Sequence, residues 1–168
     1  MLSVKKFYAL PKNSLISNGF GTIDYCDSFQ IEINADQTVD GFVNEIFILP
    51  VWAQALLAAR NVPAGLLGLK AGEDRGPESN YYTVGSQATY FTVLDRNENE
   101  IVMGMDDVHL DFRVSVMKKK REQGCSVFLT TIVKFHNTAG KLYFTTIKPF
   151  HQTIMAAMLE QAKASLEK

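Results

Sequence analysis

One short segment of the chain carries acidic, basic and anion-binding side chains at alternate positions. Four polar residues occupy every second place in it: Asp107, His109, Asp111 and Arg113. In a β-strand these side chains project from one face. Asp111 is then placed to orient His109 as a general base, and Arg113 to bind a carboxylate.

The other face of the same segment favours a structural role for the polar row. Val108, Leu110 and Phe112 form that face. If they pack against a helix, the polar row faces outward and pairs across strands. A metal site would need His109 with Asp107 or Asp111 and a third ligand from elsewhere. The spacing permits such a site without specifying it, so we assign no metal ligand.

The remaining histidines and cysteines give weaker signals. His136 and His151 do not belong to a closely spaced ligand pair. His151 follows a Pro-Phe pair, and we interpret it either as capping a carbonyl or as projecting into an interior pocket. Cys26 and Cys125 lack CxxC spacing, so we expect both to be reduced and neither to be a nucleophile.

The bulk composition bounds the classes of function. The chain has 168 residues, 17 Lys+Arg and 18 Asp+Glu, for a net charge of -1. It has no positive excess to neutralise phosphates, so nucleic acid is not an expected partner. The N-terminus resembles neither a signal peptide nor a membrane span, and we expect a cytoplasmic protein.

The first half of the chain predicts an arm, a strand and two short helices. Residues 1–22 mix turn formers with scattered apolar residues and predict an irregular arm, followed by a single domain over 23–168. Apolar alternation predicts a strand at 23–33. Helical spacing predicts a helix at 39–47, and a second helix from about Pro50 that ends by Pro63.

The second half predicts an antiparallel meander. Strand signals occur at 88–94, 101–105, 108–117 and 127–135. Because short turns join them, neighbouring strands should run in opposite directions. The polar, glycine-containing segment 70–80 is the expected mobile loop, placed to gate a pocket.

The last thirty residues leave two interpretations open. Apolar residues from Tyr143 to Met158 recur at helical spacing and predict a long helix bent at Pro149. The alternative is a final strand at 142–147, with a helix that begins at Pro149. The helical spacing favours the bent helix.

This order of elements predicts an α+β fold in which a curved antiparallel sheet buries one face against the last helix. It is the order of the helix-grip fold. The chain therefore resembles the superfamily of START lipid-transfer domains, the birch-pollen allergen and polyketide cyclases. In that superfamily the sheet wraps the C-terminal helix around a cavity.

Four strings resemble a bacterial family known as domain of unknown function 2867. They are Asp24–Phe29, Pro50–Asn61, His109–Val116 and Tyr143–His151. The resemblance implies no established reaction. Some relatives carry an NAD(P)-binding domain of the short-chain-dehydrogenase type, but this sequence has no GxGxxG string, so no cofactor is expected.

We therefore predict that the domain binds a small apolar or amphipathic molecule between the sheet and the last helix. The candidate ligand-binding residues are Trp52, Phe91, Met103, His109, Asp111, Arg113, Tyr143, Phe150, His151 and Ile154. One alternative is a polyketide-cyclase-like acid–base enzyme that uses His109, Asp111 and Arg113. Another is an interaction module that forms a homodimer or docks on a separate reductase. We assign no catalytic residue.

Overall fold

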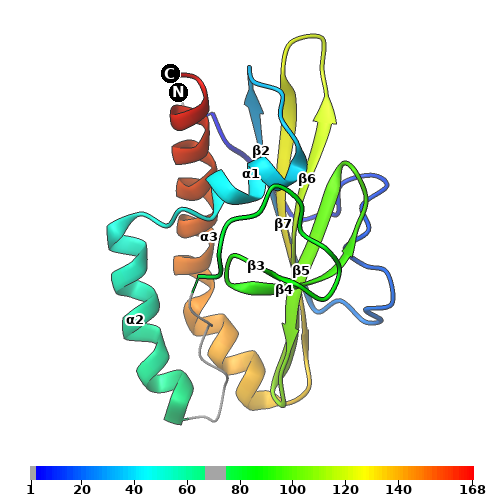
Figure 1. Ribbon diagram of the computed structural model, residues 1–168. Coiled ribbons are helices and arrows are strands. Elements are labelled where there is room, and N and C mark those ends of the chain that lie inside the picture. Colours follow the sequence, from blue (N-terminus) through cyan, green and yellow to red (C-terminus); the bar gives the residue numbers. More distant parts are fainter. Residues whose placement is uncertain (1–2, 67–74) are drawn as a thin grey trace.

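The strands of the computed structural model form one antiparallel sheet (Figure 1). The structure describes residues 3–66 and 75–168. Within them the strands are β1 (Lys5–Phe7), β2 (Tyr25–Ile33), β3 (Gln87–Ala88), β4 (Phe91–Arg96), β5 (Glu100–Asp106), β6 (Leu110–Lys120) and β7 (Cys125–Phe135). Their order across the sheet is β1-β2-β7-β6-β5-β4-β3. The α+β class and the antiparallel meander are confirmed.

Two details of the strands differ from the prediction. The arm contains β1, which pairs with β2 although its side chains are exposed. Its pairing depends on backbone groups, so the side-chain pattern carries no signal for it. The predicted strand 88–94 is interrupted at Thr89, whose positive φ of 59° turns the chain between β3 and β4.

Three helices accompany the sheet among the described residues. They are α1 (Val39–Ile46), α2 (Val51–Leu66) and α3 (Thr138–Leu166). The Thr38 side chain caps α1 by accepting a hydrogen bond from the Gly41 N–H, and Asn137 caps α3 in the same way through Gly140. The prediction that α2 ends by Pro63 is wrong, because proline removes one helical hydrogen bond without always ending a helix.

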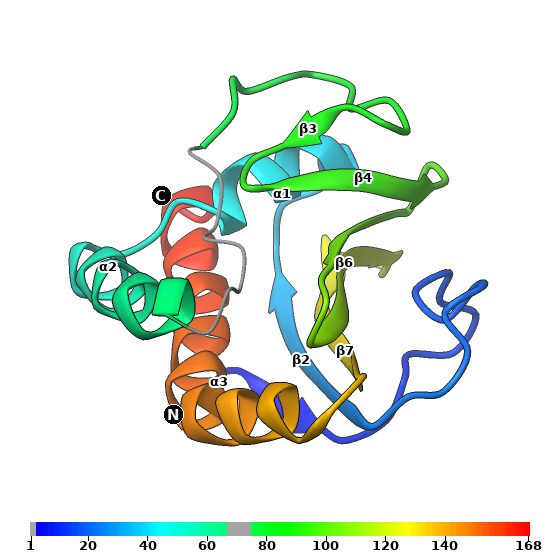
Figure 2. The ribbon, with the colours of Figure 1, turned by 90° about the horizontal axis from the view of Figure 1, so that it is seen from below.

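The long helix α3 passes without interruption through Pro149, as the bent-helix interpretation predicts. It bends along its length, and the sheet curves around it (Figure 2). Its buried side chains, which include Phe144, Met155 and Met158, lie against the sheet. Helix α2 lies on the side of α3 that is remote from the sheet (Figures 1 and 2).

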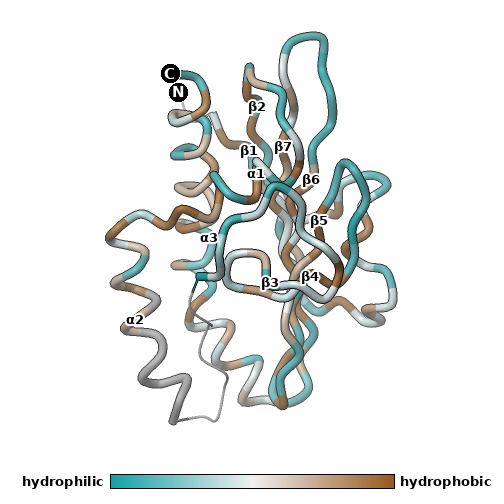
Figure 3. The backbone as a smooth tube through the Cα atoms, in the orientation of Figure 1, coloured by the Kyte–Doolittle hydropathy of each residue, from teal (hydrophilic) through white to brown (hydrophobic). Residues whose placement is uncertain are grey.

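The two faces of the sheet are covered by different parts of the chain. The concave face carries the core residues of β2, β5, β6 and β7 that pack with α1 and α3. On the convex face the arm packs Ile16 and Phe20 with Val102 and Ile132. Hydrophilic residues gather at the tip of the β6–β7 hairpin, where Arg121 is exposed (Figure 3).

Two further sequence predictions concern the loop at 70–80 and the absence of a membrane span. The first part of the predicted loop, 70–74, lies outside the described residues. Among the residues that the structure does describe, no helix is both long enough and apolar enough to cross a bilayer.

Candidate functional site

Two members of the predicted polar row, Asp111 and Arg113, lie in β6 on the convex face of the sheet, away from α3, whereas Asp107 and His109 precede the strand. On the convex face Arg113 Nη1 lies 2.6 Å from Asp106 Oδ1. Asp111 pairs with His136, at 2.9 Å between Oδ1 and Nε2, and with Lys134 at 3.4 Å. Burial alone would raise the pKa of Asp111, but the hydrogen bonds from His136 and Lys134 outweigh it and hold the pKa below its ordinary value.

His109 lies in the turn that precedes β6. Its Nδ1 is 3.2 Å from Asn137 Oδ1, at the start of α3. The contacts that the structure records for Asp111 and Arg113 lead to other partners. The three residues are therefore not gathered around a point on the concave face.

The predicted apolar candidates occupy different environments. Met103 is fully buried in the core. Trp52 on α2 is 44% exposed and Phe150 on α3 is 52% exposed. Tyr143 and Ile154 are half-buried on α3. Only part of the predicted set is thus both apolar and within reach of a ligand.

A row of side chains crosses the concave face from β2 to β4. The register places Tyr25 beside Val133, Val133 beside Phe112, and Phe112 beside Met105. Phe91 of β4 completes the row, with its ring centroid 5.2 Å from that of Phe112. We call Phe91, Met105 and Phe112, all of them half-buried, the apolar shelf.

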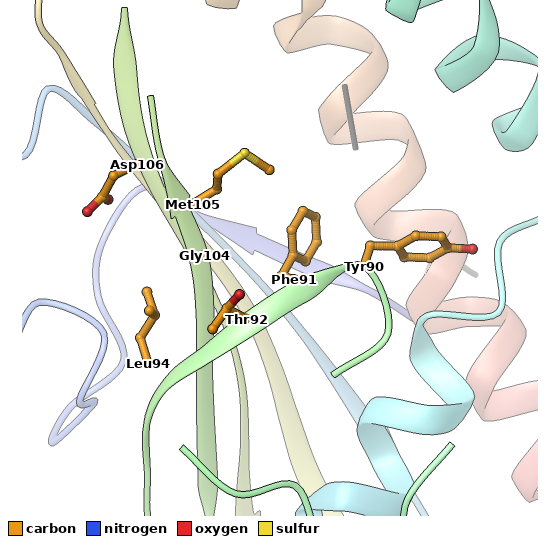
Figure 4. Close-up of a pocket in the computed structure, with 7 residues that line it drawn as sticks. All are labelled: Tyr90, Phe91, Thr92, Leu94, Gly104, Met105 and Asp106. Atoms are coloured by element: carbon orange, nitrogen blue, oxygen red, sulfur yellow. The ribbon is translucent and has the colours of Figure 1, made fainter. Parts of the chain in front are cut away.

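A pocket of about 320 Å³ adjoins the apolar shelf at β4 and β5 (Figure 4). It is lined by Tyr90, Phe91, Thr92, Leu94, Gly104, Met105 and Asp106. Phe91 and Met105 point to one side of the strands, whereas Leu94 and Asp106 point to the other. The volume lies at the lower end of the range of small-molecule sites.

The β2 end of the row is polar. Tyr25 Oη donates a hydrogen bond of 2.5 Å to Asp27 Oδ2. His151 Nε2 is 3.3 Å from the same carboxylate oxygen, and Gln152 Nε2 donates to Tyr25 Oη at 2.8 Å. Burial raises the pKa of Tyr25 well above its ordinary value, and the hydrogen bond to Asp27 adds to this effect.

The sequence places these groups together by strand and helix periodicity. Asp27 shares the inward parity of Phe29 in β2 and is fully buried. His151 lies one turn before Met155 on the buried stripe of α3. Thr131 is the register partner of Asp27 on β7, and its Oγ1 is buried without a hydrogen bond. We call Tyr25, Asp27, Thr131, His151 and Gln152 the Asp27 cluster.

Of the members of this cluster, His151 alone is among the site residues predicted from the sequence. An available signal was the inward parity of Asp27, a carboxylate among apolar residues of the same strand face. The partner of Asp27 in α3 lies 124 residues away along the chain, so spacing does not reveal the pair. Among the described residues, no three His, Cys, Asp or Glu side chains gather as a metal site would require.

Fold and site together define an α+β domain whose curved sheet presents an apolar shelf and a buried polar cluster on its concave face. The chain belongs to the family described as "Protein of unknown function (DUF2867)", which matches residues 20–158. The match covers the apolar shelf and the Asp27 cluster, and it confirms the family resemblance of the four strings. No curated protein and no solved structure matches the chain.

Proposed function

We propose that this protein binds a small apolar or amphipathic molecule on the concave face of its sheet. The observation that carries the proposal is the apolar shelf. Phe91, Met105 and Phe112 are large, adjacent and only half-buried, whereas Met103 and Val114 in the next row are buried. Large apolar side chains that remain accessible on an inner face are typical of ligand sites.

Helix α3 supplies a second apolar surface for such a molecule. Tyr143 and Ile147 pack in the same apolar cluster as Phe112, and both are half-buried. A ligand between α3 and the shelf would remove these side chains from water, at about 25 cal/mol per Å² of apolar area. The likeness of the fold to the helix-grip superfamily supports the same location, because its members hold a cavity between sheet and C-terminal helix.

The acid–base alternative that uses His109, Asp111 and Arg113 gains no support from this geometry. Asp111 and Arg113 lie on the convex face, and their ion pairs are with His136, Lys134 and Asp106. A substrate on the apolar shelf would be separated from them by the sheet. We therefore propose binding without assigning a reaction to these residues.

Calorimetric titration of the full chain with decan-1-ol tests the proposal. We expect saturable binding that Phe112→Ala weakens by about tenfold, equivalent to ~1.4 kcal/mol. Phe128→Ala is the matched control, because Phe128 is a half-buried phenylalanine of β7 on the opposite face. The proposal fails if decan-1-ol does not bind, or if the two variants weaken binding equally.

A further inference from the structure

The Asp27 cluster has fewer hydrogen bonds than its burial demands. Asp27 is fully buried, and within the described parts of the chain its carboxylate contacts just the Tyr25 hydroxyl and, at a longer distance, the His151 ring nitrogen. Beside it, Thr131 Oγ1 is buried without any hydrogen bond. Buried polar groups in proteins nearly always have hydrogen-bond partners. The missing hydrogen bonds of this cluster therefore indicate that a further polar group, supplied by a ligand, can bind there.

The cluster lies at the end of the row that carries the apolar shelf. Tyr25 is level with Phe112 and Met105 across the register of β2, β7, β6 and β5. Asp27 and Thr131 form the next inward pair, one step along the same face. A molecule that extends from the shelf along this row reaches the cluster when Phe144 of α3, which packs with Val133 and Tyr25 between them, moves aside.

We propose that the Asp27 cluster is the polar subsite of the binding site and that it selects a ligand with a neutral hydroxyl group. The inference rests on the proposed function, since the apolar shelf would hold the rest of the molecule. A hydroxyl donates one hydrogen bond and accepts others. It can donate to Asp27 while it accepts from Thr131, which satisfies both groups at once.

Charged end groups fit the cluster less well. A carboxylate would face the Asp27 carboxylate in a site from which water is largely excluded, where repulsion between like charges is strong. An ammonium group brings three donors and no acceptor, so it would leave the Thr131 hydroxyl proton unpaired. The Asp27 carboxylate also already has an imidazole partner in His151. A neutral hydroxyl avoids these costs.

The same contacts also fasten α3 to β2, because Asp27 and Tyr25 belong to the strand and His151 and Gln152 to the helix. A purely structural clamp would stabilise the fold without discriminating between ligands. Discrimination between end groups of one apolar chain is therefore the property that separates the two roles.

The test compares decan-1-ol, decanoate and decylamine by calorimetric titration against the full chain. We expect decan-1-ol to bind at least about tenfold more tightly than the other two compounds, or ~1.4 kcal/mol. Thr131→Val, which keeps the side-chain shape, should reduce the preference to about twofold or less. Asp27→Asn should improve decanoate binding, because the repelling charge is removed.

Ser115→Ala is the matched control. Ser115 Oγ is also buried without a hydrogen bond, but it lies on the convex face of β6. This variant should leave the preference for decan-1-ol unchanged. If Asp27→Asn does not fold, the comparison of Thr131→Val with Ser115→Ala is sufficient to test whether the cluster selects a hydroxyl group.

The outcomes separate the two proposals. Equal affinities for the three compounds, with binding still weakened by Phe112→Ala, would overturn the hydroxyl subsite and leave the apolar site standing. A preference for decylamine or decanoate, or a preference that survives Thr131→Val, would also overturn the subsite. Absence of binding by all three compounds would overturn both proposals.

Discussion

At the scale of single residues, neighbouring threonines on β7 differ in one respect that matters for stability. Thr130 lies on the convex face and shares a hydrogen bond of 2.8 Å with Ser28. Thr131 lies on the concave face and its hydroxyl has no partner. Both are buried, so the pair isolates the effect of hydrogen bonding on a buried hydroxyl.

We predict that Thr131→Val raises the free energy of unfolding by about 1 kcal/mol, because it removes a buried hydroxyl without a partner. Thr130→Val should lower it by about 1 kcal/mol, because it leaves Ser28 unpaired. Urea denaturation of both variants measures the two changes. Destabilisation by Thr131→Val would mean that its hydroxyl is bonded in the folded protein without ligand, contrary to the basis of the proposed subsite.

The site was harder to predict than the strands because its members come from distant segments. Alternation along 110–113 separates the polar face of β6 from its apolar face but does not say which face meets α3, and residues 107–109 lie in a turn before the strand. The sheet register decides this, since Phe112 pairs with Val133 on the inner face. Asp27 and His151 meet only when β2 and α3 pack together. Local spacing therefore predicts faces of elements, not contacts between them.

At the scale of elements, a buried ion pair connects α1 with β4. Arg96 Nη1 lies 2.8 Å from Asp40 Oδ1, and both side chains are almost fully buried. Arg96 also stacks over the Tyr81 ring at 3.8 Å. Burial alone would raise the pKa of Asp40, but the hydrogen bonds from Arg96 and the Tyr82 N–H outweigh it and hold the pKa below its ordinary value.

This lowered pKa predicts a pH dependence of stability. A carboxyl whose pKa is lower in the folded state stabilises the fold above its unfolded pKa, about 3.9 for aspartate, and this stabilisation is lost as the pH falls through the folded pKa. Asp40→Asn should cost about 3 kcal/mol at pH 7, because Arg96 stays buried without its ion pair. The difference from the wild type should shrink below about pH 4.

Urea denaturation of both proteins between pH 2 and pH 7 measures this dependence. A difference that stays constant over the whole range would contradict the assignment of the acid-sensitive stability to Asp40. The Asp106–Arg113 pair provides the control, because its Asp106 side chain is exposed and Asp106→Asn should change stability by less than about 1 kcal/mol at any of these pH values.

The elements themselves were predictable where apolar periodicity is strong. The helix α1, the strands of the meander and the unbroken α3 follow from it. The strand β1 could not be predicted from apolar periodicity, because all three of its side chains are exposed and it pairs through its backbone. The predicted end of α2 was wrong. Pro63 locally disfavours a helix, but a helix that has already formed can extend past one missing hydrogen bond.

At the scale of the whole molecule, the two faces of the sheet have different roles. The convex face is covered by the N-terminal segment through Ile16 and Phe20. On the concave face, core side chains of the sheet pack with α3 and α1, and the half-buried shelf lies at β4, β5 and β6. A ligand is therefore expected on the concave face and not on the convex one.

Methionine methyl groups report on both faces in one measurement. The chain has six methionines. Met105 belongs to the apolar shelf, whereas Met117 lies on the convex face of β6 beside Glu100. We propose a titration of methyl-labelled protein with decan-1-ol, followed by NMR. We expect a saturable shift of the Met105 methyl resonance, with the Met117 resonance unmoved. A Met117 shift without a Met105 shift, or no shift of either, would contradict binding on the concave face.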